Sequence, residues 1–224
     1  MFTVPWIVSV VLLVISFAGI AVSAAMFAKP VDEYKVSFMR MFPFEMARTA
    51  ENNGKFYSFF TYLFAGLCFA PLVIIVGGKS DLSALKPMSI LLTCVLGLSC
   101  LCFIFLNIFD VTHVKAHLSL FTVFAGLVIL SGGLIFARGL TAYKIFSDHG
   151  HKEILFLITE ILAAVSVVFT LLVLVNPKLR SWARLDNVDG TYKRPKRFVL
   201  AYSEWALLTI LFFNELVFFV QLLK

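Results

Sequence analysis

Long runs of apolar residues, separated by short polar connectors, follow one another along the whole chain. A helix that crosses a bilayer needs roughly 20 mainly apolar residues, because the hydrocarbon core is about 30 Å thick and each helical residue adds about 1.5 Å. Six runs satisfy this requirement. They predict transmembrane helices at residues 5–27, 57–76, 87–109, 117–140, 154–175 and 198–223.

The composition agrees with a membrane as the solvent of most of the chain. Of the 224 residues, 61% are hydrophobic and only 14% are charged, and the mean hydropathy is +0.96. A soluble domain of this size could not keep so much apolar surface away from water. The sequence therefore predicts an all-α polytopic membrane protein, a single bundle of about six helices over residues 1–224. The first run lacks a basic leader and is too long for a signal peptide, so we expect it to be retained.

Two connectors differ from the others in length and charge. The first (residues 28–56) mixes acidic and basic residues, and its apolar stretch at 38–44 is expected to lie in the membrane interface. The fifth (residues 176–197) is strongly basic and is expected to contact anionic lipid headgroups or a partner protein. The contact residues proposed there are the four cations nearest the last helix, Lys193, Arg194, Lys196 and Arg197.

The positive charge also bears on orientation and on partners. Six crossings place both termini on one side, and 13 of the 19 Lys and Arg residues lie on the other side, in the first, third and fifth connectors. Since Lys and Arg collect in cytoplasmic loops, this distribution puts those three connectors in the cytoplasm. No soluble module combines clustered cations with aromatic platforms, so nucleic acid is not an expected partner.

Charged and polar residues inside the predicted helices are candidates for function, because they are costly at membrane depth without a partner. Chain direction sorts them into one cluster per leaflet. Arg138 is expected to pair with Glu160 or Glu215 near one surface. Near the other surface, a cluster of Asn107, His117 and Glu204 is expected. This leaves the midplane apolar.

Glu204 and Glu215 are eleven residues apart, close to three helical turns, so they share one face of the last helix, which we expect to point into the bundle. The preferred interpretation is that both clusters are polar clasps between helices. The alternative is a proton or ion path through the carboxylates of a small transporter or channel. No broken helices or inverted repeat are visible in the sequence, which lowers the expectation of transport.

The sequence contains little that points to metal binding, cofactor binding or catalysis. The four cysteines lie inside apolar runs and are interpreted as small packing residues. There is no metal-ligand motif, no set of paired histidines for haem, and no catalytic motif of a hydrolase or phosphate-binding enzyme, so no metal, cofactor or enzyme activity is expected. Four glycines between residues 126 and 139 make the fourth helix a plausible central element.

Several short stretches resemble the DRAM family (damage-regulated autophagy modulators), which belongs to a superfamily with the yeast suppressor-of-four-kinase protein and the FGF-receptor-activating protein. The stretches are Leu96-Gly97-Leu98-Ser99, Asn107-Ile108-Phe109, Ala116-His117-Leu118, Leu140-Thr141-Ala142-Tyr143 and Ser203-Glu204-Trp205. In these stretches, four residues of this chain correspond to residues of the family: Asn107, His117, Glu204 and Trp205. The resemblance assigns no chemistry to them.

The resemblance implies six spans, cytoplasmic termini, contrary to the charge distribution, and roles in autophagy, phosphoinositide-kinase recruitment or lipid distribution. We therefore expect a non-enzymatic scaffold or accessory subunit in membrane lipid handling. Its expected partners are membrane lipids and a larger membrane protein complex. Its expected location is an endomembrane (lysosome or endoplasmic reticulum) or the plasma membrane.

Overall fold

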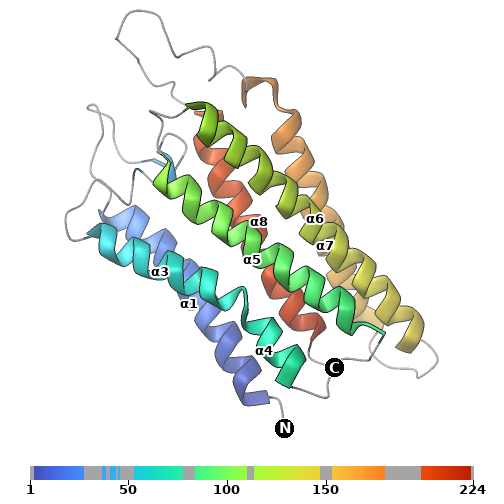
Figure 1. Cartoon of the computed structure of the whole chain (residues 1–224). Coiled ribbons are helices and arrows are strands. Elements are labelled where there is room, and N and C mark those ends of the chain that lie inside the picture. Colours follow the sequence, from blue (N-terminus) through green and yellow to red (C-terminus); the bar gives the residue numbers. More distant parts are fainter. Residues whose placement is uncertain are drawn as a thin grey trace, which may run out of the picture.

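The protein is an all-α bundle whose helices cross a membrane six times. The computed structural model describes residues 3–27, 37–38, 41–43, 45, 53–77, 84–109, 114–146, 153–179 and 198–222. Within these ranges, six helical segments are long and apolar enough to span a membrane. The start of the first helix and the end of the last lie at the same end of the bundle (Figure 1). The chain is therefore a multi-pass integral membrane protein, as predicted.

The helical elements follow the predicted runs closely. They are α1 (Thr3–Phe27), α3 (Asn53–Leu67), α4 (Ala70–Gly77), α5 (Lys86–Ile108), α6 (Val114–Phe146), α7 (Glu153–Val175), the short 3₁₀ helix η3 (Pro177–Leu179) and α8 (Val199–Gln221). The largest difference in length is in α6, which continues about one and a half turns beyond the predicted end at residue 140.

The second span is not one helix. It consists of α3 and α4, with a turn at Cys68 and Phe69 between them. Pro71 explains the break, because proline has no backbone N–H to donate to the carbonyl of Leu67 and its ring clashes with that carbonyl. The predicted span over residues 57–76 is confirmed, but its interruption at Cys68 and Phe69 was not predicted.

The last helix, α8, is the most enclosed element. In the 18-residue apolar stretch of α8, 61% of the residues are buried, against 28% in the corresponding stretches of α1 and α7. It packs against α1, α5, α6 and α7, and the Trp6 indole N–H donates to the Phe219 carbonyl at 2.7 Å. Glu204 and Glu215 are both buried, which confirms that their shared face points inward.

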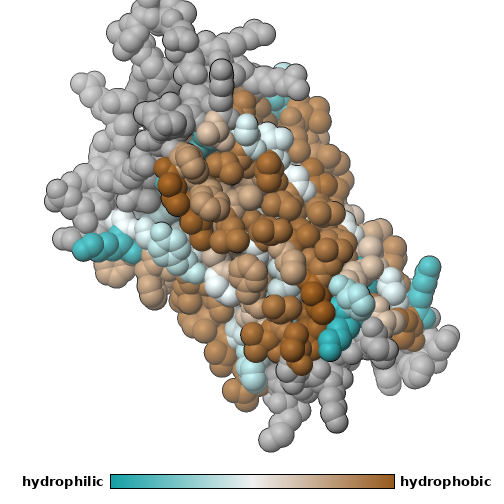
Figure 2. Space-filling view, viewed as in Figure 1, coloured by the Kyte–Doolittle hydropathy of each residue, from teal (hydrophilic) through white to brown (hydrophobic). Residues whose placement is uncertain are grey.

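The outside of the bundle is apolar between its two ends. Figure 2 shows hydrophobic side chains over the middle of one face, with hydrophilic ones toward the ends. On α7, Leu157, Leu172 and Val175 are 61–77% exposed. Such a surface is stable in hydrocarbon and not in water.

Small residues allow some of the helices to approach closely. Gly19 on α1 faces the Phe60 ring on α3, and Gly132 on α6 faces Ser166 on α7. Gly126 and Gly133, in contrast, have no neighbouring atoms where a side chain would extend. The predicted glycine stripe on α6 is therefore only partly a contact surface, and α8 is more central than α6.

Candidate functional site

His117 and Glu204 form a buried polar pair between α6 and α8. The His117 Nε2 and a Glu204 carboxyl oxygen are 2.6 Å apart, and the side chains are 0% and 1% exposed. The other ring nitrogen, Nδ1, is 2.8 Å from the Phe109 carbonyl oxygen. A carbonyl can only accept, so Nδ1 carries a proton and donates it. A second proton must then lie between Nε2 and Glu204, because two lone pairs would otherwise face each other.

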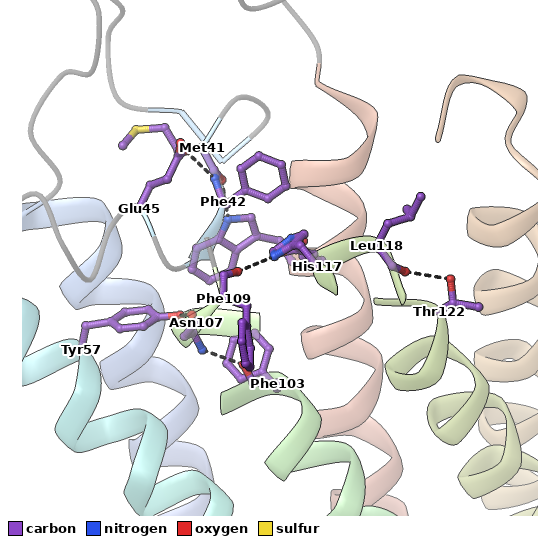
Figure 3. Close-up of polar contacts among 12 residues, drawn as sticks. Met41, Phe42, Glu45, Tyr57, Phe103, Asn107, Phe109, His117, Leu118 and Thr122 are labelled. Atoms are coloured by element: carbon purple, nitrogen blue, oxygen red, sulfur yellow. Dashed lines mark hydrogen bonds and ion pairs between the residues drawn. The ribbon is translucent and has the colours of Figure 1, made fainter. Parts of the chain in front are cut away.

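Part of the first connector covers this pair (Figure 3). The Phe42 ring stands edge-on to the His117 ring, with centroids 5.5 Å apart. The Trp205 indole N–H donates to the Met41 carbonyl at 3.0 Å, and a Glu45 carboxyl oxygen accepts the Phe42 backbone N–H at 3.0 Å. We call Met41, Phe42 and Glu45, all buried, the connector cap. The cap separates the His117–Glu204 pair from the surface at this end.

Asn107 lies close to this site but has other partners. It accepts a hydrogen bond from the Tyr57 hydroxyl at 3.3 Å and donates to the Phe103 carbonyl at 2.9 Å. Tyr57, in turn, lies close enough to Glu204 for a charge on that carboxyl group to act on the tyrosine hydroxyl. The predicted cluster is therefore present as a directly bonded His117–Glu204 pair with a neighbouring Tyr57–Asn107 pair. Tyr57 was missed by sequence reasoning, because a tyrosine at the start of a predicted span is also expected as an interfacial anchor.

Arg138 is buried at the opposite end of the bundle. Its Nε donates to the Ser89 hydroxyl at 2.8 Å, and one terminal nitrogen donates to the side-chain and main-chain oxygens of Gln221 at 3.2 and 3.3 Å. Its guanidinium carbon also lies 5.6 Å from the Phe218 ring centroid. The predicted pairing of Arg138 with Glu160 or Glu215 was wrong. Neutral oxygens of Ser89 and Gln221 accept its hydrogen bonds.

Glu160 and Glu215 are buried carboxylic side chains, and within the described ranges none of their carboxyl oxygens has a hydrogen-bond partner. Glu160 lies over Gly139, where an added side chain would overlap its carboxyl group and come within 2.9 Å of the Gln221 amide nitrogen. Glu160 therefore belongs to the Arg138 end by position. Glu215 lies farther inside the bundle.

The midplane is not apolar, contrary to the prediction. The Asn214 amide donates to the Ser131 hydroxyl at 2.9 Å and to the Val128 carbonyl at 3.3 Å, joining α8 to the middle of α6. The sulfur atoms of Cys68 and Cys100 are 2.9 Å apart, and both residues are buried. Cys68 also lies close enough to Glu215 for a charge on that carboxyl group to act on the thiol. Two of the cysteines thus form a pair that spacing along the chain could not reveal.

Comparisons with protein-family models, with curated proteins and with solved structures give no match. The resemblance to the DRAM family stays a prediction. Function must therefore be argued from the site itself.

The arrangement around His117 is suited to joining helices. Both ring nitrogens of His117 bind groups of the protein, and Glu204 is enclosed with it. Within the part of the chain that the structure describes, no three His, Cys, Asp or Glu side chains gather as metal ligands would. The predicted headgroup-binding residues Lys193, Arg194, Lys196 and Arg197 lie outside the described residues.

Proposed function

We propose that this protein is a non-enzymatic scaffold or accessory subunit in membrane lipid handling, located in an endomembrane or the plasma membrane. Its partners would be anionic lipids and a larger membrane protein complex. The resemblance of short segments to the DRAM family supports this class of function.

One observation carries the proposal. Phe198, at the start of α8, is buried and packs edge-on against the Phe42 ring, with centroids 5.0 Å apart. The cations Lys193, Arg194, Lys196 and Arg197 directly precede Phe198 in the sequence. Phe198 and the connector cap lie at one end of the bundle, so lipid headgroups beside this end would be within reach of the four cations. Basic residues beside a membrane surface gain about 1 kcal/mol each from anionic lipids.

The hydrogen bonds made by His117 support a non-catalytic role. A general base needs a free nitrogen within reach of its substrate. Both nitrogens of His117 are used internally, and Phe42 covers the ring. The pair is therefore better suited to holding α6, α8 and the first connector together.

The test is retention of anionic lipid by the full chain in nanodiscs that contain phosphatidylserine or phosphoinositide. Replacing Lys193, Arg194, Lys196 and Arg197 together by Gln should lower the amount of anionic lipid that native mass spectrometry finds on the protein. The matched control replaces Lys86 and Lys144, at the other end of the bundle, by Gln and should retain the wild-type amount. Equal retention by the fourfold variant and the wild type would contradict the proposal.

A second candidate function, proton- or ion-coupled transport, is favoured by a specific observation. Glu160 and Glu215 are buried without hydrogen-bond partners, and the second span is broken at Cys68 and Phe69. Unpaired acids and interrupted helices at membrane depth are typical of transport sites. Flux of protons or monovalent cations into reconstituted vesicles that is lost in Glu160→Gln or Glu215→Gln would establish it. Absence of flux in the wild type would remove it.

A further inference from the structure

The break between α3 and α4 places irregular backbone at membrane depth. Cys68 and Phe69 are outside both helices, and Pro71 cannot donate to the Leu67 carbonyl. Within hydrocarbon, such backbone is tolerated only where protein encloses it or where it lines a cavity. Here it is enclosed on one side: Cys68 is 0% exposed, whereas Phe69 is 38% exposed, with its ring at the place of the missing side chain of Gly97 on α5.

An unpartnered acid lies at the level of this break. About one turn earlier, Phe64 of α3 and Phe212 of α8 both pack against the Phe17 ring of α1, with centroids 6.4 and 4.2 Å from it. Glu215 is 0% exposed, and among the described residues neither of its carboxyl oxygens has a hydrogen-bond partner. It is six residues, or about 9 Å along the axis, from the end of α8 at Gln221. Glu204, the other buried acid of this helix face, is satisfied by His117. An ionised carboxylate enclosed without a partner is strongly unfavourable. The packed structure therefore requires a proton on Glu215.

Among the residues that the structure describes, the charged and titratable groups around α8 leave Glu215 without a neutralising cation. From the second span and α5, Cys68 and Cys100 approach as a thiol pair, and Cys68 lies close enough to Glu215 for a charge on its carboxyl group to act on the thiol. On α6, Arg138 donates to Gln221 and Ser89, and His117 is paired with Glu204. On α7, Glu160 lies at Gly139 and Gln221. The described helix α1 contains no titratable side chain.

We propose that Glu215, beside the Cys68–Phe69 break, is an intramembrane proton-binding site whose occupancy controls the packing of the break. With the proton bound, the carboxyl group is neutral and the second span packs against α1 and α5 as observed. Loss of the proton creates a buried charge, which favours opening at Cys68 and Phe69, where the helix is already interrupted. The ligand is a proton because Na⁺ or a divalent cation needs several oxygen ligands. The side chains named near Glu215 supply one carboxyl group and two sulfurs.

Infrared spectroscopy tests the occupancy directly. The wild-type protein in nanodiscs, labelled with ¹³C in its glutamate carboxyl groups, should show a protonated carboxylic acid band at neutral pH that is lost as the pH is raised. Glu160 is a second buried acid without a hydrogen bond among the described residues and can add to this band, so the site is read as a difference between variants. Glu215→Gln should lose part of the band, and that part should remain in Glu160→Gln. An unchanged band in Glu215→Gln would overturn the proposal, as would absence of the band from the wild type at neutral pH.

Hydrogen exchange tests the consequence for the break. Exchange of the amides in residues 64–72 should increase with pH in the wild type beyond the intrinsic pH effect, which is measured in the same run on residues 92–97 of α5. In Glu215→Gln this excess should be lost. An equal pH response of both segments in the wild type would overturn the coupling, without any need for a variant. Both measurements are independent of flux, so this site and the second candidate function can fail separately.

Discussion

His117 contributes to stability through both of its ring nitrogens. Replacing it by Ala leaves Glu204 enclosed without its partner, and loss of one member of a buried pair typically costs about 3–5 kcal/mol. Glu204→Gln should cost less, about 1 kcal/mol, because the amide N–H can still donate to Nε2. The measurement is reversible denaturant unfolding in detergent micelles.

The control for this comparison is Thr122→Val on α6. Thr122 is exposed, and its hydroxyl bonds only to the Leu118 carbonyl of its own helix at 2.9 Å. Its replacement should change the free energy of unfolding by less than about 0.5 kcal/mol. If His117→Ala were as mild as Thr122→Val, the pair would have no role in holding the bundle together.

Single residues show how far sequence reasoning reaches. His117 and Glu204 were predicted to meet because both begin helices that start at the same surface, and depth in the membrane follows from chain direction. The partners of Arg138 were not predicted, because Ser89 and Gln221 are common polar residues with no distinctive spacing. Depth could be calculated from the sequence, but the direction in which each side chain points around its helix could not. In a lipid-exposed bundle, both the core and the surroundings are apolar, so the usual indicator of the inner face is missing.

At the scale of elements, the approach of α1 to α3 depends on Gly19. A methyl group on Gly19 would overlap the base of the Phe60 ring, which cannot move without shifting its helix. Gly19→Ala should therefore destabilise the protein by about 1–3 kcal/mol through overpacking. Gly66→Ala on α3 is the matched control, because nothing lies within 4 Å of the added methyl group. It should be neutral or stabilising by up to about 1 kcal/mol. Thermal unfolding of both variants in detergent distinguishes them, and equal midpoints would refute the contact.

The break in the second span makes a separate prediction about two cysteines. A membrane-permeable oxidant should link Cys68 to Cys100, since their sulfur atoms are 2.9 Å apart. Peptide mass spectrometry should find this linkage in the wild type and in Cys94→Ser, and lose it in Cys68→Ser. Pro71→Ala restores a donor for Leu67 and favours a continuous helix, so it should reduce the yield. A dominant linkage through Cys94, which is exposed, would contradict the described packing.

The break also marks a limit of prediction at this scale. Pro71 is plainly visible in the sequence, but proline is tolerated inside membrane helices when neighbours satisfy the freed carbonyl. The hydropathy of residues 57–76 is continuous across it, so the span was predicted correctly and its interruption was not. What distinguishes the two outcomes is the space offered to Phe69 by Gly97, on another helix.

At the scale of the whole molecule, one helix holds the others together. α8 packs against α1, α5, α6 and α7, whereas α7 packs against α6 and α8 and exposes much of its surface. All six runs are apolar enough to span a membrane, so their composition could not identify the central one. The buried polar residues of α8, from Glu204 through Asn214 to Gln221, were the signal in the sequence for its position.

Two leucines of equal size test this arrangement. Leu208 on α8 is fully buried, and Leu172 on α7 is 63% exposed. Leu208→Ala removes side-chain contacts from the middle of the bundle, where neighbouring helices cannot close the gap, and should cost about 2–5 kcal/mol. At position 172 lipid fills the space that the side chain leaves, so Leu172→Ala should cost less than about 0.5 kcal/mol. Unfolding in the same detergent compares the two directly. A cost at Leu172 equal to that at Leu208 would mean that α7 is enclosed on its outer side as well, by a second copy or a partner protein.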